Sequence, residues 1–243
     1  PFIAAAGEVK TKPTQHSVRE LMEIGIQPDM LICRTERPLS EDVKRKIALF
    51  CNVEFGSVIE SRDVPSIYEI PLSFHEQGLD ERVVDRLGLG GRKADLTPWR
   101  EMVSRIYAPH GRVQIAVVGK YTDLVDSYKS VQEALIHGGI ANVTGVDITW
   151  LSSDLFTTPE RTAEMLAEVD GLLIPGGFGV RGVDGMVSAV RYAREKGLPF
   201  FGICLGMQVA SIEFGRNKCN LEDSHSSEFA PGCGNPVISL MES

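Results

Sequence analysis

One cysteine, placed where an apolar run meets a glycine-bracketed turn, constrains the fold of this chain most. Residues 202–208 read Gly-Ile-Cys-Leu-Gly-Met-Gln and follow an apolar stretch that ends at Phe201. We interpret them as a nucleophile elbow, a sharp strand-to-helix turn in which Gly202 and Gly206 remove Cβ atoms that would block it. Cys204 would then lie at a helix N-terminus, where partial positive charge favours the thiolate. The alternative is a buried structural cysteine, as most free cysteines are.

A glycine-rich segment upstream of the elbow predicts a second part of an acyl-transfer site. Residues 171–179 read Gly-Leu-Leu-Ile-Pro-Gly-Gly-Phe-Gly. The apolar run predicts a strand buried on both faces, and the glycines after it predict a loop. Acyl transfer needs backbone N–H groups that point at the developing oxyanion. We expect Gly177 and the N–H of Leu205 to supply them.

The same loop also matches a dinucleotide-binding fingerprint. Gly177, Gly179 and Gly182 have the G-x-G-x-x-G spacing. We reject this interpretation because the next predicted strand, 199–203, ends in the elbow and has no acidic residue for a ribose hydroxyl. The stretch before the next helix is also too long and charged for the tight turn.

The two motifs in this order resemble the class I, triad-type glutamine amidotransferases. The segments 113–121, 126–135 and 175–185 narrow the resemblance to the CTP synthase family. The segment 7–18 is similar to the pyrimidine-nucleotide segment of that family's synthetase domain. The resemblance runs from Pro1 to about Ser243. It implies two α/β domains with parallel-type sheets, the second an incomplete class I glutamine amidotransferase fold with a Cys nucleophile elbow.

The resemblance also implies a domain organisation. Residues 1–87 would be the C-terminal part of the synthetase (amidoligase) domain, and 113–243 the N-terminal part of the glutamine amidotransferase domain. Between them, 88–112 is glycine-rich and charged and contains Pro98 and Pro109, so we place the interdomain linker there.

A basic segment near the start of the chain suits a triphosphate. Residues 10–15, Lys-Thr-Lys-Pro-Thr-Gln, place two ammonium groups, two hydroxyls and an amide within six positions. A solvated loop is the alternative. The resemblance assigns UTP, and CTP as feedback inhibitor, to Lys10, Thr11, Lys12, Pro13, Thr14 and Gln15, together with Lys46 of an adjacent helix. It assigns contact with ATP to Arg62, Asp63 and Val64.

In the amidotransferase part, the resemblance makes Cys204 the catalytic nucleophile and implies a glutamine pocket. The residues it assigns to that pocket are Gly177, Leu205, Gly206, Met207, Gln208 and Glu228, with the Glu228 carboxylate facing the substrate ammonium group. A lone glutamate in a polar loop is otherwise usually solvated. The family's reaction releases ammonia from glutamine through a Cys thioester, and the ammonia travels internally to the synthetase site. There UTP, activated by ATP with Mg²⁺, is aminated to CTP, and GTP is an allosteric activator of the glutaminase step.

Two family motifs do not occur in this sequence. It contains no G-x-x-x-x-G-K-[ST] P-loop and, beyond the elbow, no His-x-Glu motif to complete the triad. We therefore expect the chain to be the middle of a longer enzyme and to be inactive alone. The alternatives are another class I glutamine amidotransferase and a non-catalytic truncated fragment. Family members assemble as homotetramers.

Composition excludes several classes of protein. A formal net charge of −8 argues against general affinity for nucleic acid. No apolar run approaches the roughly 20 residues needed to span a bilayer. The five cysteines show no metal-binding spacing, and their odd number fits a reducing cytoplasm. No histidine follows a catalytic pattern, and we predict no metal site.

Local signals predict several element boundaries. Ser17 and Glu20 form a capping box for a helix that ends at Gly25, and a strand at 30–33 follows. Ser40 caps a helix whose predicted core face contains Val43, Ile47 and Phe50. Further along, Thr158 begins a helix and Gly197 ends one.

Overall fold

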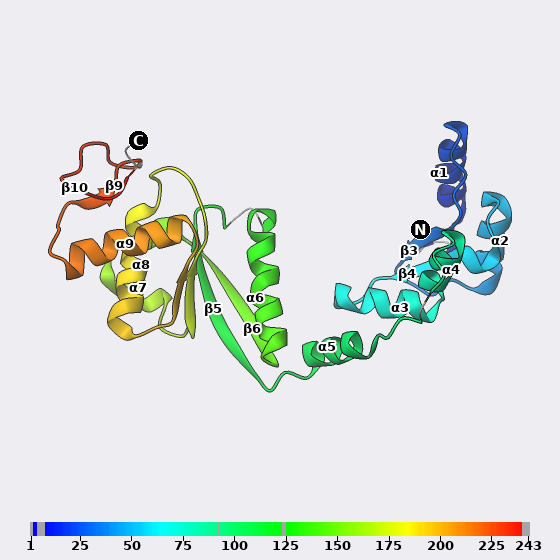
Figure 1. Ribbon diagram of the computed structural model, residues 1–243, viewed down its shortest axis with the longest axis horizontal. Coiled ribbons are helices and arrows are strands. Elements are labelled where there is room, and N and C mark those ends of the chain that lie inside the picture. The colour runs from blue at the N-terminus through cyan, green and yellow to red at the C-terminus, as the bar shows by residue number, and fades with distance from the viewer. Residues whose placement is uncertain (1, 4–7, 92, 123–124, 240–243) are drawn as a thin grey trace. The chain divides into compact units, whose positions relative to one another are not determined.

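The chain divides into two compact units, Pro1–Val103 and Ser104–Ser243, and each is described by itself (Figure 1). This computed structural model describes residues 2–3, 8–91, 93–122 and 125–239. Gly7, within the segment that suggested a pyrimidine-nucleotide site, therefore lies outside the described residues, as do both chain ends. Helix α5 (Thr97–Tyr107) lies inside the segment predicted as a linker, and the division between the units falls within this helix.

The first unit is built on two parallel strands, β3 (Leu31–Thr35) and β4 (Val58–Arg62). Helices α1 (Lys12–Glu23) and α2 (Glu41–Cys51) pack with them. Their buried core consists of Val18, Ile47, Ala48, Cys51 and Val58. The other elements are β1 (Phe2–Ile3), antiparallel to β2 (Glu8–Val9), the 3₁₀ helices η2 (Phe55–Ser57) and η3 (Ile67–Glu69), and helices α3 (Ile70–Glu76) and α4 (Leu79–Arg86).

Two details of this unit differ from the sequence-based prediction. Helix α1 begins at Lys12, not near Ser17, because Pro13 occupies the first turn, where its fixed φ suits a helix. Ser17 lies inside the helix, and its hydroxyl donates to the carbonyl of Pro13. Phe50 was predicted in the core face of α2 but is 61% exposed. Cys51, one position later, fills the core because it follows Ile47 and Ala48 at helical spacing.

The second unit is an open parallel sheet with strand order β6-β5-β7-β8. The strands are β5 (Gly111–Gly119), β6 (Thr144–Ser152), β7 (Gly171–Ile174) and β8 (Phe200–Gly202). The helices are α6 (Lys129–Ala141), α7 (Pro159–Met165), α8 (Val183–Lys196) and α9 (Leu205–Lys218). Figure 1 shows α6 on one face of this sheet and α7, α8 and α9 on the other. The remaining elements are η4 (Val125–Tyr128), η5 (Ser153–Leu155), and the parallel pair β9 (Ser224–Ser226) and β10 (Asn235–Ile238).

The order of these strands defines where a ligand can bind. From β5 the chain moves to β6 on one side and then to β7 on the other. In open parallel sheets, ligands bind at the carboxyl ends of the strands, beside such a change of direction. The loops after β5 and β7 meet there. The predicted α/β class with parallel sheets is confirmed in both units.

Several predicted boundaries are confirmed. The Ser40 hydroxyl accepts from the N–H of Val43 at the start of α2, and the Thr158 hydroxyl accepts from the N–H of Arg161 at the start of α7. Gly197 ends α8 with φ 69°. Among the described helices, none is both long and apolar enough to cross a membrane.

Candidate active site

Cys204 occupies a strained turn between β8 and α9. It is the N-cap of α9 with φ 51° and ψ −102°, a conformation that L-residues rarely adopt, and the residue is exposed. The turn is tied to β7 because the N–H of Ile203 donates to the carbonyl of Ile174 at 2.9 Å. The strain therefore lies at the predicted nucleophile, which the geometry of a nucleophile elbow requires.

The two glycines that bracket the cysteine have separate steric reasons. A Cβ on Gly202 would lie 2.5 Å from the carbonyl carbon of Gly206, inside the turn itself. A Cβ on Gly206 would lie 2.2 Å from the backbone oxygen of Ile174 in β7. The missing Cβ of Gly202 lets the turn close, and the missing Cβ of Gly206 lets α9 pack directly against the sheet.

The loop after β7 lies against the elbow. A Cβ on Gly176 would be 3.7 Å from Cβ of Cys204, and one on Gly177 would be 3.2 Å from Cδ2 of Leu205. Leu205 is the first residue of α9, so its N–H has no partner within the helix. The structure thus brings Cys204, Gly177 and Leu205 together, an arrangement that lets backbone donors reach a carbonyl attacked by the thiol.

A hollow of about 390 Å³ reaches α9 at Gln208, one helical turn after Cys204. Gln208 and Glu228 line it, together with Ser226, Ser227, Ile238 and Ser239. The side-chain oxygen Oε1 of Gln208 is buried and, within the described part of the chain, has no hydrogen-bond partner. An unpaired buried acceptor and a carboxylate at one hollow suit a ligand that carries hydrogen-bond donors and a positive charge.

Two residues of the predicted glutamine pocket present their side chains elsewhere. Met207 lines a different, mainly apolar hollow with Phe214 and Leu221. Leu205 is 1% exposed and packs in the core of the unit. At the elbow these two residues can act only through their backbone groups.

Two charged residues at this site, Lys120 and Arg181, were not predicted from the sequence. Lys120, directly after β5, is 5% exposed, and its Nζ donates to the carbonyls of Phe178, at 3.1 Å, and Gly179. Burial lowers the pKa of Lys120, and the charge of Arg181 lowers it further, whereas Glu228 acts in the opposite direction. The only sequence signal for a role of Lys120 was its position directly after a predicted buried strand.

The predicted pyrimidine-nucleotide residues partly converge in the first unit. Lys10, Thr11, Lys12 and Lys46 line a hollow of about 420 Å³, together with Val9, Asp42 and Val43. Thr11 is the N-cap of α1, and the first turn of that helix contains no acidic residue. A helix N-terminus next to lysines favours an anion.

The remaining three residues of the segment belong to the first turn of α1 and do not line this hollow. They are Pro13, Thr14 and Gln15. The Gln15 side chain donates to the Thr11 hydroxyl at 3.0 Å. Gln15 therefore supports the residue that lines the hollow.

The residues predicted to contact ATP lie at the carboxyl end of β4. Arg62 is paired with Glu60 at 2.8 Å, and Asp63 is paired with Arg34 at 2.9 Å. Val64 follows them in the same loop. The carboxyl ends of β3 and β4 lie side by side, where open parallel sheets bind ligands.

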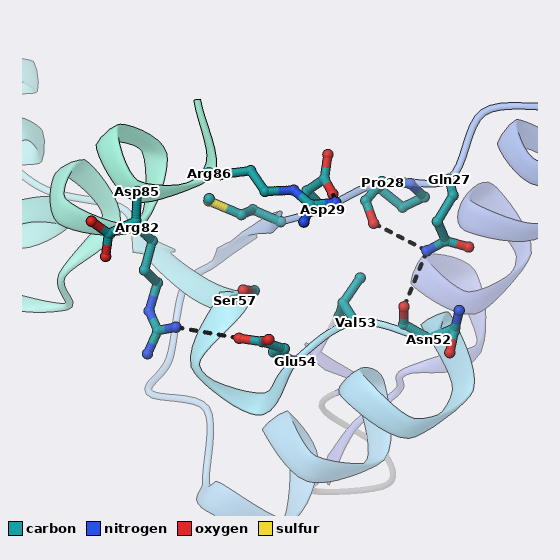
Figure 2. Close-up of a pocket in the computed structure, with 11 residues that line it drawn as sticks. Gln27, Pro28, Asp29, Asn52, Val53, Glu54, Ser57, Arg82, Asp85 and Arg86 are labelled. Atoms are coloured by element: carbon teal, nitrogen blue, oxygen red, sulfur yellow. Dashed lines mark hydrogen bonds and ion pairs between the residues drawn. The ribbon is translucent and has the colours of Figure 1, made fainter. Parts of the chain in front are cut away.

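Another hollow of the first unit lies at the opposite, amino ends of these strands (Figure 2). Its volume is about 450 Å³, and two arginines project into it. Arg82 pairs with Glu54 at 3.7 Å, and Arg86 pairs with Asp29. Both cations of this hollow are thus paired with carboxylates.

The backbone strain at Cys204 predicts an unusual order of stabilities. Glycine has no steric cost at positive φ, so we expect Cys204→Gly to be more stable than Cys204→Ala by about 1 kcal/mol. Cys219 is a matched control because it has φ −97° at the end of α9. There the glycine variant should be the less stable one. Urea unfolding of the four variants measures both differences, and the same order at both positions would contradict strain at the elbow.

Comparisons with known proteins agree with this geometry. The family model "CTP synthase N-terminus" matches residues 1–89, and "Glutamine amidotransferase class-I" matches 123–235. The CTP synthase of Koribacter versatilis is 56% identical over 239 residues, which are 98% of this chain and 43% of that protein. The CTP synthase of Geobacter sulfurreducens is 56% identical over 243 residues, 100% of this chain and 45% of that protein.

A solved structure supports the amidotransferase part. The glutaminase domain of Trypanosoma brucei CTPS with bound acivicin is 40% identical, with a TM-score of 0.51, and the match covers 54% of this chain and 50% of that one. The chain spans less than half the length of the curated relatives it matches. With a match to a synthetase model and to an amidotransferase model in one polypeptide, the chain belongs to the CTP synthase family.

Proposed function

We propose that this chain contributes to a glutamine-hydrolysing CTP synthase and that Cys204 is its glutaminase nucleophile. The observation that carries the proposal is the contact of the Gly176–Gly177 loop with an exposed cysteine on a strained turn. A positive-φ cysteine has a conformational cost, and proteins keep such strain mainly at functional sites.

The proposed half-reaction uses the groups brought together at the elbow. The Cys204 thiolate attacks the side-chain carbonyl of glutamine, and the N–H groups of Gly177 and Leu205 stabilise the oxyanion. The C–N bond then breaks, the nitrogen gains a proton and leaves as ammonia, and a γ-glutamyl thioester remains. Glu228 holds the substrate ammonium group, and Gln208 offers its unpaired oxygen as an acceptor.

The proposed second half-reaction uses ammonia to convert UTP into CTP with ATP. We assign UTP, and CTP as inhibitor, to the hollow lined by Lys10, Thr11, Lys12 and Lys46. We assign contact with ATP to Arg62, Asp63 and Val64 at the end of β4. In this proposal GTP activates the glutaminase step, and the complete enzyme is a cytoplasmic homotetramer.

In this proposal Mg²⁺ acts together with ATP at the synthetase site. The described residues include no group of three or more His, Cys, Asp or Glu side chains that could hold a metal ion. We therefore assign no residue of this chain to Mg²⁺.

Alkylation by a glutamine analogue tests the proposed nucleophile. Acivicin should label Cys204 and spare Cys219, the other exposed cysteine, and L-glutamine should slow the labelling. Iodoacetamide, which needs no glutamine pocket, serves as the comparison reagent and should label both. Equal acivicin labelling of the two cysteines, or no protection by glutamine, would contradict the proposal.

UTP binding tests the hollow of the first unit. A ligand at 100 times its Kd stabilises a protein by about 2.7 kcal/mol, and a tenfold loss of affinity removes about 1.4 kcal/mol of this. We expect Lys46→Ala to reduce the stabilisation by UTP by about that amount in thermal unfolding. Lys44→Ala, in the same helix but outside the lining, is the control. An equal effect of both variants would place UTP elsewhere.

A further inference from the structure

Lys120 connects the end of β5 to the loop that follows β7. Its Nζ donates to the carbonyls of Phe178 and Gly179, the two residues directly after Gly177. The lysine stem also lines this loop, since a Cβ on Gly177 would lie 3.7 Å from Cδ of Lys120. A buried ammonium group needs such acceptors, and here both acceptors are loop backbone.

Arg181 makes the reverse connection. It lies in the same loop, and its Nη2 donates to the backbone carbonyl of Lys120 at 2.5 Å. Its Nη1 pairs with Asp154 at 2.6 Å, in the segment that follows β6. The end of β5 therefore holds the loop backbone through a side chain, and the loop holds the backbone at the end of β5 in the same way.

The ammonium group of Lys120 also lies near the segment that contains Glu228 and Phe229. Nζ lies 5.7 Å from the ring centroid of Phe229, within the range of a cation–π contact. The negative charge of Glu228 acts on Lys120 as well. One ammonium group thus lies between the loop of Gly177 and the residue proposed to hold the substrate ammonium.

These contacts restrict how the loop can rotate. A trans peptide carries its C=O and N–H on opposite sides. When Nζ holds the oxygens of Phe178 and Gly179, the N–H groups of those two peptides, which belong to Gly179 and Val180, face away from Lys120. The N–H of Gly177 belongs to an earlier peptide of the same loop, so Lys120 fixes the backbone directly after it. Gly179 has φ 77°, so without this hold the glycine-rich loop has other backbone conformations available.

We propose that Lys120 and Arg181 form a clamp that fixes the loop of Gly177 beside Cys204, with Lys120 as a positioning residue for oxyanion stabilisation. The inference rests on the proposed glutaminase function. The clamp holds the loop backbone that follows Gly177, and through it the position of the Gly177 N–H, and it does not touch the reacting atoms.

An activated substrate isolates the step in which the clamp acts. With the γ-p-nitrophenyl ester of L-glutamate, the Cys204 thiolate forms a C–S bond, the C–O bond breaks, and p-nitrophenolate leaves with the electron pair. The leaving group needs no proton donor. Removal of one oxyanion donor typically slows catalysis about 10²- to 10³-fold, and we expect Lys120→Met, which only loosens a donor, to slow acylation about 10- to 100-fold.

Three comparisons separate positioning from folding. Lys196→Met removes the same charge from an exposed site at the end of α8 and should leave acylation unchanged. Iodoacetamide should alkylate Cys204 at nearly the same rate in Lys120→Met and in the unmodified chain, because alkylation forms no oxyanion. Hydrogen exchange of the peptide covering 175–182 should be faster in Lys120→Met only.

The outcomes decide the two proposals separately. Slower acylation with unchanged alkylation and faster loop exchange supports the clamp. Unchanged acylation overturns it, and so does a loss of acylation in proportion to alkylation and Tm, which indicates a folding role alone. Acylation is measured in the complete enzyme proposed above; if that enzyme is not acylated at all, the glutaminase function fails, and loop exchange still tests the clamp.

Discussion

Replacement of Arg194 by methionine is expected to lower the free energy of unfolding of the second unit by about 3–5 kcal/mol. The Glu213 side chain in α9 is 1% exposed, and Arg194 of α8 contacts both of its carboxylate oxygens, with Nη2 2.7 Å from Oε1. Asn217 adds one bond at 3.1 Å. Without the guanidinium, a buried carboxylate loses its charged partner, and this desolvated charge accounts for the cost.

A neighbouring arginine supplies the control for this prediction. Arg191, also in α8, pairs with Glu195, but both side chains are about half exposed. Arg191→Met should therefore cost no more than about 1 kcal/mol. The double variant Arg194→Met/Glu213→Gln should recover part of the stability because a neutral amide is easier to bury. Equal urea midpoints for Arg191→Met and Arg194→Met would show that the buried pair stabilises the unit no more than the exposed pair does.

Gly206→Ala is expected to damage both the fold and the site. The new Cβ would lie 2.2 Å from the carbonyl oxygen of Ile174, a backbone atom of β7 that cannot move cheaply. Helix α9 must then shift away from the sheet, which costs about 1–3 kcal/mol or more. Because Cys204 is the N-cap of this helix, the shift should also move the thiol away from the Gly177 loop. We expect lower stability in urea together with loss of selective acivicin labelling.

Gly138→Ala is the matched control. Gly138 lies in α6, and a Cβ there would meet no heavy atom within 4 Å. The same substitution should stabilise this helix by roughly 0.5–1 kcal/mol and leave labelling unchanged. A Gly206→Ala variant that behaves like Gly138→Ala would mean that α9 does not pack on β7 as closely as described.

The elbow could be predicted from the sequence because its requirements are local. Gly202, Cys204 and Gly206 stand within five residues, and their spacing alone predicts the strained turn that the structure has. The helix caps at Ser40 and Thr158 could be predicted for the same reason, since a capping hydroxyl acts on an N–H three residues away. The roles of the predicted site residues stay predictions until the experiments above are made.

Other features depend on contacts that the sequence does not show. Lys120 and Arg181 are far apart in the chain, and their clamp follows from β5 and β7 being neighbours in the sheet. The predicted start of α1 was wrong because two helix-start signals compete in this segment, a capping box at Ser17 and a proline at position 13. The proline determines the first turn. The prediction for Phe50 failed because helical periodicity allows either of two adjacent positions to face the core.

The most direct test of the central claim is the location of the γ-glutamyl group after reaction with the γ-p-nitrophenyl ester of L-glutamate. Mass analysis of the complete enzyme proposed above, intact and as acid-quenched peptides, gives both the number of adducts and their position. The account predicts one thioester, on Cys204, and none on Cys219, the other exposed cysteine. An adduct on Cys219 at a comparable rate, or no adduct on Cys204, would contradict it.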